Sequence, residues 1–216
     1  MELDIIQKEN PVFNDIRRKS IYKIKDNMYA FWYRLVSSNV FKIENDNGDN
    51  ILNNIEKNGE LSNYLGYIFE DVCKQYLIIN QGEYFEFDNI GRWWGRNPAT
   101  KQEEEIDIVG YNSENILFGE CKYINELVGV DVSDNLVRKS KLISHNRNVM
   151  YVLFYKKGFN ENLIQMAIKE IILDLLKWMI FIKSEIGYML TKSNVNSIFF
   201  TVSRRSLKDG LEENLE

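Results

Sequence analysis

The chain has 216 residues, of which 44% are hydrophobic and 27% charged, and its formal net charge is −5. This composition is typical of one globular domain, or one domain with an appendage, and excludes a wholly disordered chain. The single histidine, His145, argues against Ser-His-Asp, Cys-His and HExxH chemistry, because each needs an imidazole with its other parts. Two cysteines, Cys73 and Cys121, cannot form a disulfide framework.

In the first third of the chain, residues 3–7 and 20–25 are predicted to pair as a β-hairpin. Asp26 stands where a helix N-cap belongs, and an aromatic helix is expected over 27–38. The turn-rich segment 45–50 is predicted to be a loop and the best boundary in this region.

The middle of the chain alternates between helical and extended patterns. Apolar residues at helical spacing predict a helix that starts at Leu61, and a polar, basic helix is expected over 131–146. Extended segments are expected at 83–88, 89–95, 105–111, 115–123 and 149–155. After Asn160 the pattern is mostly helical, although the apolar stretch 171–182 fits a helix or a strand. This order predicts an α/β fold with a mixed sheet flanked by helices and a small N-terminal hairpin and helical segment.

The same patterns divide the chain into three parts: an N-terminal segment 1–60, a core 61–160 and a C-terminal extension 161–216. The N-terminus has no basic or apolar region of a signal peptide, and the stretch 171–182 is too short to span a bilayer. No GxxxxGK[ST] motif occurs, so ATP binding through a P-loop is not expected. The expectation is a cytoplasmic protein without membrane association.

Charge is unevenly distributed along the chain. Residues 61–130 carry five basic and twelve acidic side chains, whereas 135–160 carries six basic and no acidic ones. An acidic centre followed by a basic segment fits a metal site beside a polyanion. A solvated helix face followed by a basic loop explains the same pattern without any ligand.

Two acidic residues interrupt apolar strands that a short turn connects. Asp107 lies between two isoleucines, and Glu120 and Lys122 follow the apolar run of the next strand. Pairing of these strands would bring the two carboxylates together, where hard oxygen ligands favour Mg²⁺ or Mn²⁺ and a lysine stabilises charge on a phosphate. Glu70, on the helix before the strands, adds a further carboxylate if it points over the sheet edge. The alternatives are a cross-strand ion pair on a surface hairpin, and a polar helix face at Glu70.

The helical Glu, the Asp of EIDIVG and the Glu-x-Lys of ILFGECKY together resemble the PD-(D/E)XK nuclease superfamily. The proline of that pattern is replaced by Ile106, which does not alter the ligand itself. More narrowly, the stretches from about 19 to 159 resemble the domain of unknown function at the C-terminus of archaeal and bacterial DEXX-box, AAA-type ATPases.

The resemblance implies a restriction-endonuclease-like fold that hydrolyses phosphodiester bonds in DNA with Mg²⁺ or Mn²⁺. Asp107, Glu120 and Glu70 would ligate the metal, and Lys122 would assist the water or the phosphate. It also implies an ATPase partner, or an ATPase domain that has been lost. One alternative is a catalytically silent nuclease-like module that binds DNA or regulates an ATPase. Another is a homo-oligomerisation domain that exposes an apolar face of the C-terminal stretch 171–190 in a monomer.

Several basic side chains are candidates for holding nucleic acid. Arg92 and Arg96 flank two tryptophans that stack on bases in this interpretation, or divide between the core and partial exposure in the simpler one. His145 is expected to be a helix C-terminal residue favoured by the helix dipole. The full set of phosphate-binding candidates is Arg92, Arg96, Arg138, Lys139, Lys141, Lys156 and Lys157.

Overall fold

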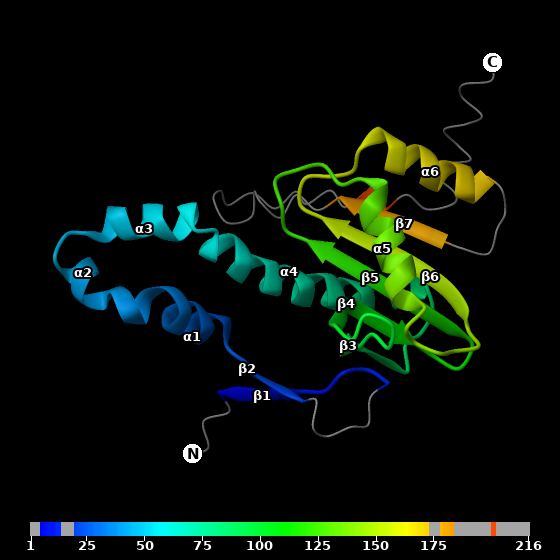
Figure 1. Cartoon of the computed structure of the whole chain (residues 1–216), viewed down its shortest axis with the longest axis horizontal. Helices are drawn as coiled ribbons and strands as arrows, with labels where there is room; N and C mark the ends of the chain where they lie inside the picture. The colour runs from blue at the N-terminus through cyan, green and yellow to red at the C-terminus, as the bar shows by residue number, and fades with distance from the viewer. Residues whose placement is uncertain (1–4, 14–19, 173–177, 184–199, 202–216) are drawn as a thin grey trace.

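The computed structural model describes residues 5–13, 20–172, 178–183 and 200–201. A two-stranded hairpin leads into a helical arm, which is followed by a six-stranded sheet with helices on both faces (Figure 1). The strands are β1 (Ile6–Glu9), β2 (Ile21–Ile24), β3 (Asn89–Arg96), β4 (Glu103–Tyr111), β5 (Asn115–Lys122), β6 (Asn148–Tyr155), β7 (Trp178–Lys183) and β8 (Phe200–Thr201). The helices are α1 (Asn27–Phe31), α2 (Val40–Glu44), α3 (Gly48–Lys57), α4 (Glu60–Ile79), α5 (Val130–Ser140) and α6 (Glu161–Ile172).

The predicted N-terminal hairpin is present, with β1 and β2 antiparallel, but its first strand is Ile6–Glu9 and not the predicted 3–7. The chain after β1 then crosses the edge strand β3, where the Val12 N–H donates to the Arg92 carbonyl at 2.9 Å. A Cβ at Gly91 would lie 3.0 Å from a Val12 methyl, so glycine permits this close crossing. Asp26 is the N-cap of α1, as expected, and its Oδ1 accepts the Tyr29 N–H at 3.0 Å.

The helical arm is more broken than the sequence predicts. The helix expected over 27–38 is divided into α1, a π-helical segment Trp32–Val36 and a 3-10 turn Ser37–Asn39. Ser37 Oγ and Asn39 Nδ2 donate to backbone carbonyls four residues earlier, and such bonds compete with regular helix geometry. The loop expected at 45–50 ends early, because α3 already begins at Gly48.

The sheet has the order β3-β4-β5-β6-β7-β8. Strands β3, β4 and β5 form antiparallel pairs, β5, β6 and β7 pair in parallel, and β8 is antiparallel to β7. The helices α5 and α6 lie in the two connections between parallel strands, as such connections require. The predicted fold class, α/β with a mixed sheet flanked by helices and a small N-terminal hairpin, is confirmed.

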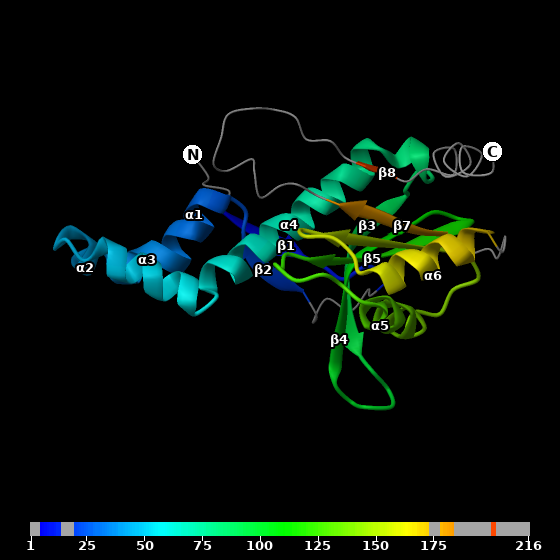
Figure 2. The same cartoon turned by 90° about the horizontal axis from the view of Figure 1, so that it is seen from above.

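The core is divided by the sheet into two layers (Figure 2). On one face α4 packs through Phe69, Cys73 and Leu77 against β4, β5 and β6. On the other face Leu136 of α5 and Leu163 of α6 pack against the opposite side of the same strands. Among the residues that the structure describes, no helix combines the length and the apolar character needed to cross a membrane.

Three sequence-based predictions are wrong in detail. Residues 83–88 form no strand: a 3-10 turn ends at Glu83, and Phe85 and Phe87 pack edge to face instead. Helix α5 ends at Ser140, so His145 lies beyond it and the helix dipole does not explain its position. Its ring lies 5.7 Å from that of Phe118.

The apolar stretch 171–182 belongs to two elements. It contains the last two residues of α6 and most of β7. Residues 173–177 lie outside the described residues, as does most of the stretch 171–190 that the oligomerisation hypothesis used.

Candidate active site

The candidate site lies where β4 and β5 separate. Their pairing runs only from Tyr111↔Ile116 to Ile108↔Gly119. Beyond that point β4 pairs with β3 alone and β5 pairs with β6 alone. Figure 2 shows the hairpin of β3 and β4 extending away from the rest of the sheet. Asp107 and Glu120 are the first residues after the last pair, one on each diverging strand.

A β-bulge directs Asp107. Gly91 pairs with Val109 and Trp93 with Ile106, so β4 carries one more residue than β3 across this interval. Bulges of this kind change the direction of a side chain and occur often beside active sites. In the gap between the strands, Asp107 Oδ2 accepts the backbone N–H of Cys121 at 2.7 Å.

Glu120 is 2% exposed and lies between two lysines. Lys122 Nζ forms an ion pair with Glu120 Oε1. Lys139 Nζ, from α5, is 3.4 Å from Glu120 Oε2. A buried carboxylate is costly unless charges of opposite sign accompany it, and these two ammonium groups supply them.

The charge of Glu120 also acts on Asp107. Burial and then the negative charge of Glu120 raise the pKa of Asp107 to about 6, although the Cys121 N–H, Lys122 and Lys139 oppose the rise. Burial by itself would lower the pKa of Lys122, but the charge of Glu120 outweighs it and the pKa is raised. Both carboxylates are buried, and the charge of Glu120 acts on Asp107, so the two lie in one region, as the sequence predicted for this strand pair.

Glu70 completes a group of three carboxylates. Burial and then the charge of Asp107 raise its pKa to about 7, while Arg92 lowers it. Arg92 Nε, from β3, lies 3.5 Å from Glu70 Oε2, and its Nη2 lies 3.2 Å from Glu105 Oε2. Glu70 follows the buried Phe69 on α4, which places it at the edge of the helix face that packs on the sheet.

Tyr155 is a site residue that sequence reasoning missed. It is fully buried at the end of β6, opposite Lys122 in the parallel pair. Its hydroxyl has no hydrogen-bond partner among the described residues, and burial, followed by Glu120 and Asp131, raises its pKa. The signal was available, because β5 and β6 were both expected to be buried strands and polar groups at the ends of neighbouring parallel strands meet at one sheet edge.

The donor chemistry of this region suits a hard divalent cation. Such ions take carboxylate and other oxygen ligands. Burial, and then the charge of a neighbouring carboxylate, raises the pKa of Glu70 and of Asp107, and a cation bound between them would oppose both effects. The buried Tyr155 hydroxyl has no hydrogen-bond partner among the described residues, so it could bond to a ligand or a water at this site. Within the described residues, however, no three His, Cys, Asp or Glu side chains are already placed to hold a metal together. Binding would require Glu120 to exchange contacts with its two lysines for a contact with the ion.

The residues expected to bind nucleic acid do not form one continuous track. Arg92 and Lys139 belong to the candidate site itself. Arg138 Nη1 and Nη2 donate to both carboxylate oxygens of Glu104, at 2.7 and 2.6 Å, and so tie α5 to β4. Arg96 Nε donates to the Lys101 carbonyl at 2.9 Å in the turn after β3.

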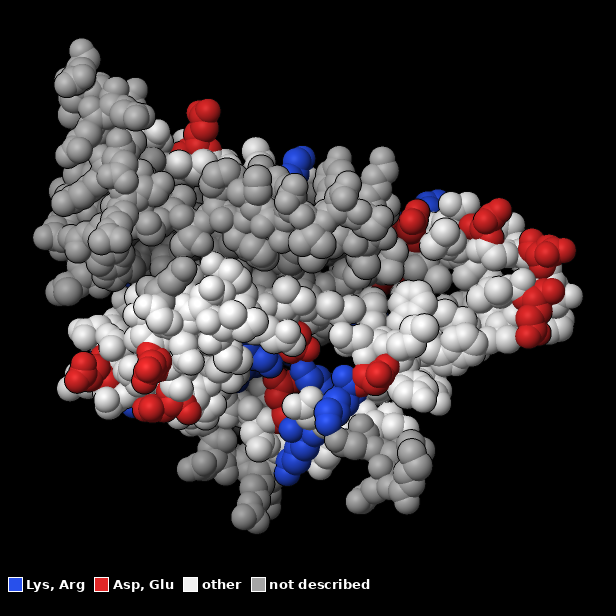
Figure 3. Space-filling model, turned by 180° about the vertical axis from the view of Figure 1, so that it is seen from behind, with Lys and Arg blue, Asp and Glu red and all other residues white. Residues whose placement is uncertain are grey.

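The remaining candidates lie on or near the surface. Lys141 and Lys157 are exposed, and the Lys156 ammonium lies 4.4 Å above the ring of Tyr123. The two tryptophans divide as the simpler interpretation expects, because Trp93 is buried and Trp94 only partly so. On the face shown in Figure 3, basic side chains gather around a hollow in which acidic side chains are also visible.

Comparisons with known proteins place this arrangement in a family. A family model described as archaeal and bacterial proteins of unknown function, DUF234, matches residues 32–139. An uncharacterized protein of Methanocaldococcus jannaschii is 35% identical over 152 residues, which cover 66% of this chain and 32% of the relative. The chain thus spans about a third of the length of this relative. No solved structure matches the chain. Since the family model covers half of the sequence and includes Glu70, Asp107, Glu120 and Lys122, the chain belongs to the DUF234 family.

Proposed function

We propose that the chain is a metal-dependent nuclease that hydrolyses phosphodiester bonds in DNA. One observation carries the proposal: two buried carboxylates, Asp107 and Glu120, lie at the point where two strands separate, with Lys122 in contact with one of them. Glu70 lies near this pair: it forms an ion pair with Arg92, and after burial the charge of Asp107 is the next cause that raises its pKa. Mg²⁺ or Mn²⁺ is the proposed cofactor, and Asp107, Glu120 and Glu70 are its proposed ligands.

Asp107, Glu120 and Glu70 would hold the ion, which would supply Lewis-acid chemistry at the phosphate and at an attacking water. Asp107 is already oriented by the Cys121 N–H, so it offers its second oxygen without a change of backbone. Lys122 is 38% exposed and bonded to Glu120, and it donates to a non-bridging phosphate oxygen as charge develops there. Arg92 holds Glu70 in place through the contact between their side chains.

The test is metal binding measured together with cleavage. The wild-type chain is expected to bind Mn²⁺ in calorimetry and to nick a supercoiled plasmid only when Mn²⁺ or Mg²⁺ is present. Glu120→Gln keeps the shape of the side chain but removes its charge, so both signals should disappear. Glu56→Gln makes the same change at an exposed side chain of α3, outside the site, and as the matched control it should keep both signals. Metal binding by Glu120→Gln equal to that of wild type would contradict the ligand assignment.

A second candidate function has its own supporting observation. Each carboxylate of the site already has a protein partner, because Lys122 and Lys139 contact Glu120, Arg92 contacts Glu70, and the Cys121 N–H donates to Asp107. Carboxylates whose charges and hydrogen bonds are already matched by protein groups need no metal ion. This suits a catalytically silent module that binds DNA or regulates an ATPase. The relative from Methanocaldococcus jannaschii is about three times as long as the matched region, which leaves room for a further domain in that protein. DNA binding that persists without any Mn²⁺ binding would favour this candidate.

A further inference from the structure

An apolar cavity adjoins the candidate site and shares two of its residues. It has a volume of about 430 Å³ and lies between the hairpin β1–β2, the helical arm, α4 and β3. Glu70 and Arg92 belong both to its lining and to the candidate site. Its volume falls within the range of about 300–1,000 Å³ that is typical of small-ligand sites. Whatever occupies the cavity therefore lies next to the group that Glu70 would help to bind.

Aromatic rings form a large part of the cavity wall. Tyr33, Tyr64 and Tyr67 line it, and the guanidinium of Arg34 lies 5.3 Å from the centre of the Tyr67 ring. Tyr33 is 62% exposed and Tyr67 is 51% exposed, so both rings offer a free surface to a ligand. Tyr64 is buried, and its hydroxyl donates to the Asn27 carbonyl at 2.6 Å, which fixes the inner wall. Aromatic rings and guanidinium planes are the two kinds of surface on which unpaired bases stack.

The charges around the cavity distinguish a base from a phosphate. The lining holds three basic and three acidic residues: Lys23, Arg34, Arg92, Glu9, Glu70 and Asp71. Asp71 is in turn paired with Lys23 and Lys74, at 3.3 and 3.2 Å. A balanced, largely apolar lining suits a neutral planar ring and gives a phosphate no net attraction.

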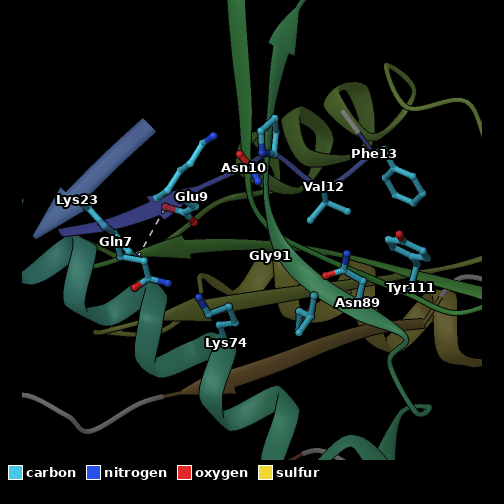
Figure 4. A pocket seen from close by; sticks show the side chains of 13 residues that line it. Gln7, Glu9, Asn10, Val12, Phe13, Lys23, Lys74, Asn89, Gly91 and Tyr111 are labelled. Atoms are coloured by element: carbon cyan, nitrogen blue, oxygen red, sulfur yellow. Dashed lines mark ion pairs between the residues drawn. The ribbon is translucent and has the colours of Figure 1, made fainter. Parts of the chain in front are cut away.

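A second, polar cavity of about 880 Å³ adjoins the first, because Glu9 and Lys23 line both. It lies between β1, the segment that follows it, α4 and β3, and Figure 4 shows Lys74 extending from α4 and the ion pair between Lys23 and Glu9. Three lysines and one glutamate line it: Lys8, Lys23, Lys74 and Glu9. This excess of positive charge suits the phosphates that follow a base along a strand.

We propose that the aromatic cavity receives one unpaired base of a DNA strand whose adjoining phosphate lies at Glu70, Asp107 and Glu120. The inference rests on the proposed nuclease function and deepens it by naming the substrate class as DNA with an unpaired segment, such as a single strand or a flap. A paired base is stacked and hydrogen-bonded within the duplex, so it cannot enter the cavity without first leaving the helix.

The experiment uses the full chain with Ca²⁺ in place of Mn²⁺, and an oligonucleotide that carries one fluorescent adenine analogue. The same strand is offered either alone or paired in a blunt duplex. Wild type should bind the single strand at least about tenfold more tightly, and stacking should quench the analogue. Tyr67→Ala should lower single-strand affinity by about tenfold to a hundredfold and restore the fluorescence. Tyr67→Phe keeps the ring and should behave as wild type.

Two further variants show whether an effect of Tyr67→Ala comes from the cavity or from misfolding and the loss of any exposed ring. Tyr33→Ala removes a second exposed ring of the cavity and should weaken binding in the same direction. Tyr22→Ala removes a ring on β2 that is 70% exposed and does not line either cavity, so it should leave binding unchanged. Equal affinity for strand and duplex, or wild-type affinity in both cavity variants, would overturn the proposal. It would also fall if wild type is a dimer that the cavity variants convert to monomer without any effect on DNA, because a second copy would then occupy the cavity.

The failure of this inference is distinguishable from that of the nuclease function. If Mn²⁺-dependent cleavage occurs but is equal for strand and duplex and insensitive to Tyr67→Ala, the base cavity is wrong and the nuclease stands. If wild type quenches the analogue but never cleaves, the cavity stands and the nuclease function is wrong.

Discussion

Asp107 Oδ2 accepts the backbone N–H of Cys121 at 2.7 Å, across the point where β4 and β5 part. This single bond joins two strands that no longer pair with each other. It also holds Asp107 beside Glu120, whose charge raises the pKa of Asp107. The hydrogen bond and the adjacent bulge therefore keep two carboxylates close together in spite of their repulsion.

Replacing Asp107 with asparagine should separate stability from metal binding. The side-chain amide in Asp107→Asn would still accept the Cys121 N–H through its carbonyl oxygen but would not repel Glu120. The rise in the pKa of Asp107 from 3.8 to about 6 corresponds to at most about 3 kcal/mol of ionisation cost at neutral pH. In EDTA, Asp107→Asn should therefore be as stable as wild type or more stable in urea unfolding, while the stabilisation by Mn²⁺ is lost. A large loss of stability in EDTA would show that the charge of Asp107 supports the fold.

The pH dependence of stability should have an unusual sign for carboxylates. The pKa of Asp107 is raised to about 6 and that of Glu70 to about 7, so the folded state binds protons more tightly than the unfolded chain. Their stabilising contribution is complete below about pH 4 and is lost as the pH rises to about 7. The charged groups that act on them are Arg92, Glu105, Glu120, Lys122 and Lys139.

The measurement is thermal unfolding in EDTA and in Mn²⁺, between about pH 5 and pH 8. Protons compete with a metal for carboxylates, so Mn²⁺ should raise the melting temperature more at the higher pH. In the double variant Glu70→Gln with Asp107→Asn, the melting temperature in EDTA and the increase caused by Mn²⁺ should both depend less on pH. A wild-type Mn²⁺ effect that is the same at both pH values would contradict the assigned ligands.

Gly119 allows the strands to meet immediately before the site. A Cβ there would lie 3.0 Å from the Ile108 Cβ and 3.1 Å from a Val152 methyl, on the two neighbouring strands. Gly119→Ala should therefore destabilise the fold by about 1–3 kcal/mol, because the backbone of β4 or β6 must shift. Gly66→Ala is the matched control, since nothing lies within 4 Å of its Cβ and alanine favours a helix by up to about 1 kcal/mol. Denaturant unfolding of both variants checks the contrast, which a stable Gly119→Ala would contradict.

DNA affinity should depend on the exposed lysines more than on Arg138. The guanidinium of Arg138 is already bonded to both oxygens of Glu104, whereas Lys141 and Lys157 are exposed. Lys141→Glu and Lys157→Glu should each weaken binding uniformly across sequences and reduce the salt slope by about 1. Arg138→Ala should have the smaller effect in the same salt titration. The reverse order would place the bound DNA along β4 and α5 instead.

The fold was predictable where one local pattern determines an element. Asp26 marked the start of α1, and the apolar runs around Asp107 and Glu120 marked β4 and β5. Prediction failed where side chains compete with the backbone or where distant contacts decide. The broken helix at Ser37 and Asn39 is of the first kind.

The candidate site was predictable in its acids but not in its cations. The spacing along two strands predicted that Asp107, Glu120 and Lys122 lie close together, and they do so in the structure. Lys139 and Arg92 were predicted to bind phosphate. In the structure they form ion pairs with Glu120 and Glu70 instead. The sequence could not show this, because the approach of α5 to Glu120 and of β3 to Glu70 depends on tertiary packing. The bulge at Asp107 is equally invisible in sequence, since it appears only as a shift in strand register.

Lys122→Ala in a single-turnover cleavage assay with Mn²⁺ distinguishes a nuclease from a catalytically silent module. Lys122 is one of two lysines that accompany the buried Glu120, so its removal should lower stability, by at most about 3–5 kcal/mol because Lys139 remains. Both proteins are therefore assayed under conditions in which unfolding curves show them fully folded. If its ammonium stabilises charge that develops on the phosphate, the cleavage rate should fall on the order of 10²–10³-fold while DNA affinity changes little. A nuclease is expected to show wild-type cleavage together with that loss in Lys122→Ala. An equal rate of cleavage in the two proteins, or none in either, would contradict it.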